Sequence, residues 1–215
     1  MAPSTQNFVS LSDDLIDCIL MFLPDFSSLF SFILASKRIY DIFDRHPISI
    51  LQPIIQEEIG PAFPQALRLV RVAADMRSRN PDHWPSERVV VDNPVTLREA
   101  ACLARNASTI GQLEDIFSRS NKDFYSSSPK SVLSASESKQ FHVAAYRFWL
   151  YAKAFRPEYD LQGMLLEDCI RFRSTFFQHL VDAELREFTC FVQFLADVVL
   201  WVGTATGRVF CAPAG

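Results

Sequence analysis

Glycine is scarce in this sequence, at only six of 215 residues. None of the six forms a GxGxxG, P-loop or GxSxG pattern, the motifs whose backbone N–H groups bind a phosphate or an oxyanion. The nearest stretch, Gly203 to Gly207, is not followed by a lysine. We therefore name no catalytic residue and predict that the chain is not an enzyme.

Cysteine and histidine are also few. The five cysteines never occur in CxxC spacing, and an odd, scattered set is typical of reduced thiols in the cytoplasm or nucleus. The four histidines are isolated from one another and from acidic or cysteine residues at metal-ligand spacing. We expect a cytoplasmic or nuclear protein with no metal and no cofactor.

An excess of positive charge and long apolar runs are missing as well. The net charge is −4, which gives no electrostatic reason to expect a nucleic-acid partner. The apolar stretch Leu15 to Leu34 is broken by Asp17, Pro24 and Asp25, and Phe188 to Val202 is too short to span a bilayer. We expect no membrane partner, and the first residues have no basic segment typical of a secretion signal.

Strand signals are sparse, because only residues 88–91 and 208–211 hold short β-branched or aromatic runs without hairpin turns. The fold class is therefore predicted to be mainly α. The clearest helix lies in the segment 185–202, where three- and four-residue spacing puts six apolar residues on one face. These six are Leu185, Phe188, Val192, Leu195, Val199 and Val202.

Three more helices are predicted upstream. One begins near Ser134, which forms a capping box with Glu137, and its apolar face is Phe141, Ala145, Phe148, Ala152 and Phe155. Residues 161–180 form another, with Leu165, Cys169, Phe172 and Phe176 on one face. Short connections predict antiparallel neighbours among these helices. A Thr96–Glu99 capping box starts a helix toward Ser108, with Leu97, Ala101 and Ala104 facing inward.

The remaining segments are irregular or interrupted. A helix over 57–76 is broken at Gly60-Pro61 and Pro64, and a proline-containing connector follows it up to residue 94. Nine of the 21 residues in 118–138 are serine, which predicts a surface loop. Trp149, Tyr151 and Phe155 could bind a partner, but their helical spacing is more typical of a core.

The densest apolar segment lies near the N-terminus, where 17 of the 27 residues in 8–34 are apolar. Three short helices are predicted here, with a break at Pro24-Asp25, a third helix after Ser36 and a stop at residues 45–47. Helices this short cannot bury so much apolar surface among themselves. The surplus packs on the rest of the chain or is kept for a partner, and composition does not decide between the two.

The residue order in this segment resembles an F-box motif. Leu11, Asp14, Leu15, Ile16, Ile19, Leu20, Leu23 and Pro24 match its opening, and Leu29, Ile33, Ser36 and Lys37 match its close. Ser12 replaces the usual proline, and Ile39 replaces the usual tryptophan. Residues 46–51 and 59–71 are similar to the sequence that follows the motif in filamentous-fungal F-box proteins.

The resemblance implies a module of three helices that binds a Skp-family adaptor protein and, through it, a cullin scaffold and a RING ubiquitin ligase. The rest of the chain would bind a protein substrate of unknown identity. The adaptor-binding residues would be Leu11, Leu15, Ile16, Ile19, Leu20, Leu23, Pro24, Leu29, Ile33, Ser36, Lys37 and Ile39. The alternative is a non-catalytic interaction protein that uses the same module without ubiquitination.

The expected organisation has five parts. A flexible N-terminus (1–7) precedes the F-box-like module (8–50), and a helix with an irregular connector follows (51–93). An all-helical domain of antiparallel helices (94–202) contains the serine-rich loop 118–138, and residues 203–215 form a C-terminal tail.

Overall fold

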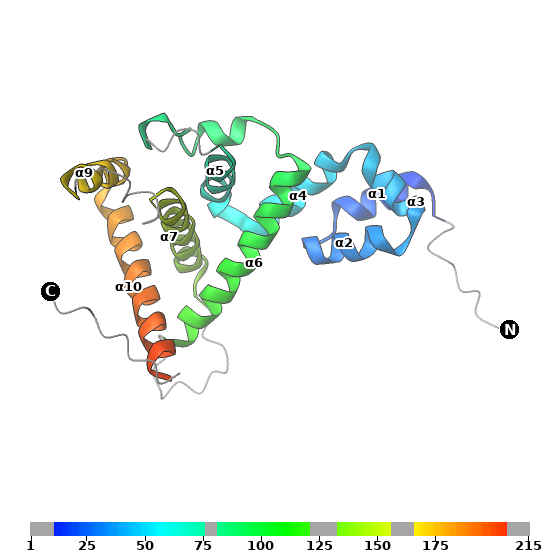
Figure 1. Cartoon of the computed structure of the whole chain (residues 1–215). Coiled ribbons are helices and arrows are strands. Elements are labelled where there is room, and N and C mark those ends of the chain that lie inside the picture. Colours follow the sequence, from blue (N-terminus) through cyan, green and yellow to red (C-terminus); the bar gives the residue numbers. More distant parts are fainter. Residues whose placement is uncertain (1–10, 76–80, 121–132, 156–165, 206–215) are drawn as a thin grey trace.

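The computed structural model describes residues 11–75, 81–120, 133–155 and 166–205 (Figure 1). Within these ranges every regular element is helical, which confirms the mainly-α prediction. The expectations for residues 1–7, for the middle of the serine-rich loop, for the strand-like run 208–211 and for Leu165 lie outside the described residues.

The N-terminal region contains the three short helices expected there: α1 (Asp13–Met21), α2 (Phe26–Ala35) and α3 (Lys37–Arg45). The side chain of Ser12 accepts a hydrogen bond from the N–H of Leu15 at 3.4 Å, and Asp25 Oδ1 accepts one from Ser28 at 2.7 Å. These two caps satisfy N–H groups that the first turn of a helix leaves free. The break between α1 and α2 contains Pro24, as expected.

The next helix, α4 (Pro47–Ile59), corrects the predicted boundary after residue 50. Pro47 does follow the end of α3, but it also occupies the first position of α4, where its missing N–H leaves no hydrogen bond unmade. Pro53 lies inside the same helix. Two prolines disfavour a helix in this segment. The helix forms because Ile50, Leu51 and Ile54 are buried, and their packing stabilises it.

A sharp bend follows at Gly60, the one described residue with a positive φ, at 62°. The short 3₁₀ helix η2 (Gly60–Ala62) leads into α5 (Phe63–Ala74), so the predicted interruption at Gly60-Pro61 is confirmed. Pro64 does not interrupt α5, because it lies in the first turn.

The connector contains two 3₁₀ turns, η3 (Pro81–His83) and η4 (Val89–Asp92). Arg71 of α5 holds it in place by donating hydrogen bonds to the carbonyl oxygens of Val90 and Pro94 and to Glu99 Oε1 at 2.7 Å. Trp84 and Val90 are buried. The connector is irregular, as predicted, but it is packed against the helices.

The C-terminal region is built from α6 (Leu97–Ser120), α7 (Ala135–Ala154), α9 (Leu166–Phe177) and α10 (Asp182–Ala205). Both predicted capping boxes form: Thr96 with Glu99, and Ser134 with Glu137. Helix α6 continues beyond the expected end at Ser108. The loop expected over 118–138 is consequently shorter, because its two ends are helical.

Helices α7 and α10 are antiparallel neighbours, as their ring contacts show. Phe141 near the start of α7 contacts Phe194, whereas Tyr151 near its end contacts Phe188, with ring centroids 5.9 and 6.0 Å apart. Helix α9 departs from this pattern. It crosses the end of the pair (Figure 1), where Phe176 contacts Tyr151 at 5.4 Å and Phe188 at 6.2 Å.

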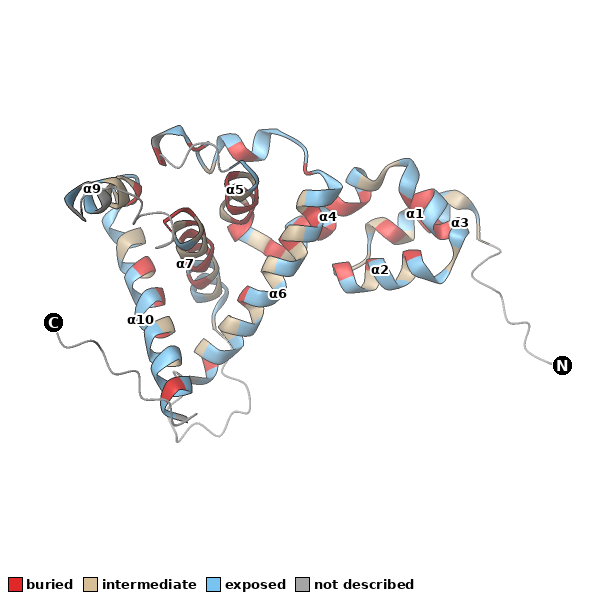
Figure 2. Ribbon diagram, viewed as in Figure 1, coloured by how far each residue is buried: buried red, intermediate tan, exposed pale blue. Residues whose placement is uncertain are grey.

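The buried faces of two helices are rotated from those predicted (Figure 2). In α10, Phe188 is buried as expected, but Val192, Val199 and Val202 are exposed; Phe191 and Phe194 are buried in their place. In α6, Leu97 and Ala101 are exposed, and the buried residues include Ala100, Leu103 and Ile110. Neighbouring positions on a helix differ by about 100°, and the large phenylalanine rings decide which side of α10 is buried.

Helix α7 lies at the centre of the C-terminal region and is buried on more than one side. Helix α5 packs on it from one direction and α10 from another. Phe141, Ala145 and Phe155 are buried as predicted, whereas Ala152 is exposed. The aromatic contacts of Tyr151 and Phe155 with α9 agree with a core role for these two residues.

Candidate functional site

Helices α1, α2 and α3, called the N-terminal module below, pack around buried apolar side chains that are continuous with the core of the other helices. Helix α3 packs against both α1 and α2, and α4 packs against α1. The buried side chains of the module are Ile16, Leu20, Phe26, Leu29, Ile33, Ile39, Ile42 and Phe43. The module lies at one end of the molecule, and α4 joins it to the other helices (Figure 1).

Five of the twelve predicted adaptor-binding residues belong to this core, which corrects their assignment. Ile16 is 1% exposed and Leu20 is fully buried. Leu29, Ile33 and Ile39 are also buried. A side chain that docks on a partner must be accessible before binding. These five residues therefore stabilise the module and do not form its surface.

The other seven predicted residues retain accessible surface. Leu15 is 52% exposed, and Pro24 and Lys37 are exposed as well. The half-buried residues are Leu11, Ile19, Leu23 and Ser36. Leu11 and Leu23 pack partly against the core.

The structure adds exposed apolar residues that the motif does not indicate. Phe22 in the turn after α1 is 87% exposed, and Leu34 on α2 is 81% exposed. Phe30 precedes Leu34 by four positions and is also exposed, so the two share one side of α2. Leu15, Phe22, Phe30 and Leu34 are called the exposed apolar set below. Composition indicates more apolar residues than three short helices can bury. Only the packing in the structure shows which of them are exposed.

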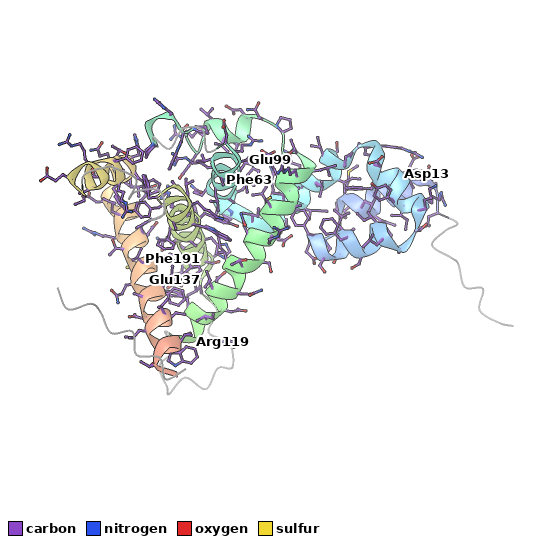
Figure 3. All side chains as sticks on the ribbon, viewed as in Figure 1. Asp13, Phe63, Glu99, Arg119, Glu137 and Phe191 are labelled. Atoms are coloured by element: carbon purple, nitrogen blue, oxygen red, sulfur yellow. The ribbon has the colours of Figure 1, made fainter. Side chains whose placement is uncertain are left out.

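Ion pairs tie the start of α1 to α3. Arg38 donates to Asp13 Oδ1 at 2.7 Å and to the carbonyl oxygen of Leu11 at 2.7 Å, and Arg45 lies 3.1 Å from Asp13 Oδ2. The hydrogen bonds from Arg38 and Arg45 hold the pKa of Asp13 below its ordinary value. Asp13 lies at the end of the molecule farthest from the C-terminal helices (Figure 3), so this network orders the outer edge of the module.

A second contact joins the module to α4. Glu58 near the end of α4 accepts a hydrogen bond from the backbone N–H of Phe26 at 3.2 Å, at the first residue of α2. Burial raises the pKa of the Glu58 carboxyl above its ordinary value. His46 and Asp17 form a further pair at 2.6 Å, between the end of α3 and α1.

The described part of the chain has neither a cluster of metal ligands nor a membrane-spanning helix. There, no three histidine, cysteine, aspartate or glutamate side chains lie together as metal ligands could. No described helix is both long enough and apolar enough to cross a bilayer.

Comparison with known proteins adds no family to these observations. No protein-family model, no curated protein and no solved structure matches the chain.

Proposed function

We propose that the chain is an F-box-type substrate receptor of a Skp–cullin–RING ubiquitin ligase. In this proposal the N-terminal module docks on a Skp-family adaptor, and the helical remainder engages a protein substrate in the cytoplasm or nucleus. The observation that carries the proposal is the exposed apolar set on a module that already has a hydrophobic core.

The burial pattern favours a partner as the destination of the surplus apolar surface. The chain uses Ile16, Leu20 and Leu29 for its own packing and leaves Phe22 and Leu34 in water. Burying a side chain of this size on a partner contributes about 1.5–3 kcal/mol. Amphipathic helices that offer such side chains typically dock in an apolar groove.

The two departures from the motif fit the same proposal. Ser12 caps α1 through its side chain, so the helix begins at the expected place without a proline. Ile39 is buried in the core of the module, where a tryptophan would need more space. Both changes therefore affect the internal packing and capping of the module more than the side chains on its surface.

A receptor must hold its two binding surfaces in a defined arrangement. Helix α4 packs against α1 on one side and α6 on the other, and the Glu58–Phe26 hydrogen bond links α4 to α2. This continuity supports a module held firmly relative to the C-terminal helices. The chain supplies binding surfaces only, and the transfer of ubiquitin belongs to other subunits.

Affinity purification of the double variant Phe22→Asp/Leu34→Asp tests the proposal. We expect co-purified adaptor to fall at least tenfold, because charged side chains on a docking face oppose burial. Leu200→Asp is the matched control, since Leu200 is an exposed residue of α10. Circular dichroism should show all three proteins equally folded. Adaptor retained at the wild-type level by the double variant, or missing from the wild type, contradicts the proposal.

The same purification separates the two functional classes. A cullin that co-purifies with the adaptor supports the ligase receptor. An adaptor found without any cullin supports an interaction protein that uses the module without ubiquitination.

A further inference from the structure

The C-terminal region contains a cavity that the docking module does not explain. Its volume is about 540 Å³, and it is lined by residues of α5, α7, α9, α10 and the connector. This volume is within the range of about 300–1,000 Å³ typical of small-molecule sites. One wall is aromatic, because the rings of Trp84 and Phe176 lie edge to face with centroids 6.2 Å apart.

The polar part of the lining includes Arg147, a buried arginine of α7. Its Nε and one terminal nitrogen donate to the two oxygens of Glu87 at 2.9 and 3.0 Å. The same terminal nitrogen donates to Glu184 Oε1 at 2.7 Å. Arg147 therefore joins two carboxylates from different parts of the chain.

Both carboxylates are already occupied as hydrogen-bond acceptors. Glu87 also accepts a hydrogen bond from Gln65 Nε2 at 2.5 Å. The second oxygen of Glu184 accepts from the N–H of Val181 at 3.0 Å. The shortest hydrogen bonds of both carboxylates therefore go to groups other than Arg68.

A second arginine of the cavity wall, Arg68 of α5, is left without such partners. Its guanidinium comes no closer to Glu87 than 3.8 Å, and its buried Nε has no hydrogen-bond partner. The side chain is only 13% exposed. Burial lowers the pKa of Arg68; the charge of Glu87 opposes this effect, and the charge of Arg147 adds to it. The protein covers the Nε atom itself, so an anion in the cavity would meet the terminal nitrogens of the guanidinium, and its charge would offset the cost of burying the cation.

We propose that this cavity binds a small organic acid, whose carboxylate pairs with Arg68 and whose apolar part packs against Trp84 and Phe176. A planar guanidinium suits a carboxylate, because it can donate two parallel hydrogen bonds. The aromatic wall favours an acid with an aromatic or branched apolar group. This inference concerns the C-terminal helices and does not depend on adaptor docking.

A purely structural role for the cluster predicts a different behaviour. In that case Arg68 would stabilise the fold through Glu87, and removing it would destabilise the protein. If Arg68 is instead kept for a ligand, its long 3.8 Å ion pair with Glu87 contributes little, and its removal costs little stability. Stability and binding thus respond differently in the two cases.

Isothermal titration calorimetry on the purified full chain tests the inference, with N-acetylphenylalanine as the probe. We expect saturable binding of this acid. N-acetylphenylalaninamide should bind at least tenfold more weakly because it lacks the charge, and inorganic phosphate at least tenfold more weakly because it lacks the ring. This comparison uses only the wild-type protein, so it does not depend on the folding of a variant.

The variant Arg68→Gln should lower the affinity for the acid at least tenfold without lowering the melting temperature. Arg105→Gln, at an exposed position of α6 that does not line the cavity, should leave both quantities unchanged. No saturable binding of the acid overturns the inference. Equal binding of acid and amide, or wild-type affinity in Arg68→Gln, does so as well.

Discussion

The carboxylate of Glu58 accepts a hydrogen bond from the backbone N–H of Phe26 at 3.2 Å, which joins the end of α4 to the start of α2. This contact spans 32 positions in the sequence and places a charged group in partly buried surroundings. Burial is the largest influence on the carboxyl and raises its pKa, and the nearby charge of Asp25 acts in the same direction.

The raised pKa of Glu58 predicts a pH dependence. The folded chain binds the proton more strongly than the unfolded chain, so the contribution of Glu58 to stability is full below its ordinary pKa and declines as the pH rises. Glu58→Gln keeps an oxygen acceptor without the charge. We expect this variant to be at least as stable as the wild type at pH 7, with a difference that shrinks toward pH 4.

Urea unfolding at a series of pH values measures this effect. Glu57→Gln is the control, because the neighbouring Glu57 is exposed and should leave the pH dependence as it is. If Glu58→Gln were less stable than the wild type at pH 7, and by the same amount at every pH, burial of the charged carboxylate would not lower the stability of the wild type.

Arg147→Met is expected to destabilise the chain by about 3 kcal/mol, because it leaves two partly buried carboxylates without their closest cation. Burial by itself would raise the pKa of Glu87, but hydrogen bonds and the charge of Arg147 outweigh it and lower the pKa. This stabilisation is present at neutral pH and is lost as the pH falls below the ordinary pKa of glutamate.

The variant should therefore lose most of its disadvantage in acid, and urea unfolding at pH 7 and pH 3 would show it. Arg186→Met provides the comparison, since Arg186 is an exposed residue of α10. If Arg147→Met unfolded like Arg186→Met at pH 7, the Arg147–Glu87 pair would have no stabilising role.

Leu20 and Leu15 lie on the same helix, but replacing them by alanine should change stability by very different amounts. Leu20→Ala removes a fully buried side chain, and we expect a loss of about 2–5 kcal/mol. Leu15→Ala should change stability by less than about 0.5 kcal/mol, because half of the side chain is in water. Thermal unfolding of both variants measures the difference. Similar losses in the two variants would contradict the division between core and exposed apolar set.

Ser134→Ala removes the capping box at the start of α7, where Ser134 and Glu137 each accept a hydrogen bond from the other's N–H. We expect a loss of about 0.5–2 kcal/mol. Ser138 of the same helix has no capping role, so Ser138→Ala should not destabilise the chain. Equal melting temperatures for the two variants would show that the box does not contribute to stability.

Local signals in the sequence predicted much of this fold. The two capping boxes and the break at Gly60-Pro61 involve residues within three or four positions of each other, so they do not depend on distant parts of the chain. The predicted stop at residues 45–47 did not anticipate the start of α4, because a proline can follow one helix or begin the next. Only contacts with α1 and α6 explain why the helix persists.

The cluster around Arg68 had no signal in the sequence. Glu87 and Arg147 are 60 positions apart, and Glu184 is a further 37 positions along. Each looks like an ordinary surface charge in its own segment. The packing of α5, α7 and α10 brings these charges together.

By itself, the sequence determined that the chain is mainly helical, where most helices begin, and that the N-terminal segment has more apolar residues than three short helices can bury. These properties follow from residue spacing and caps within single helices. Tertiary structure decided which apolar residues form the core of the module and which remain in water. That division depends on the neighbouring helices, because a leucine at position 15 and one at position 20 are chemically the same until packing covers one of them.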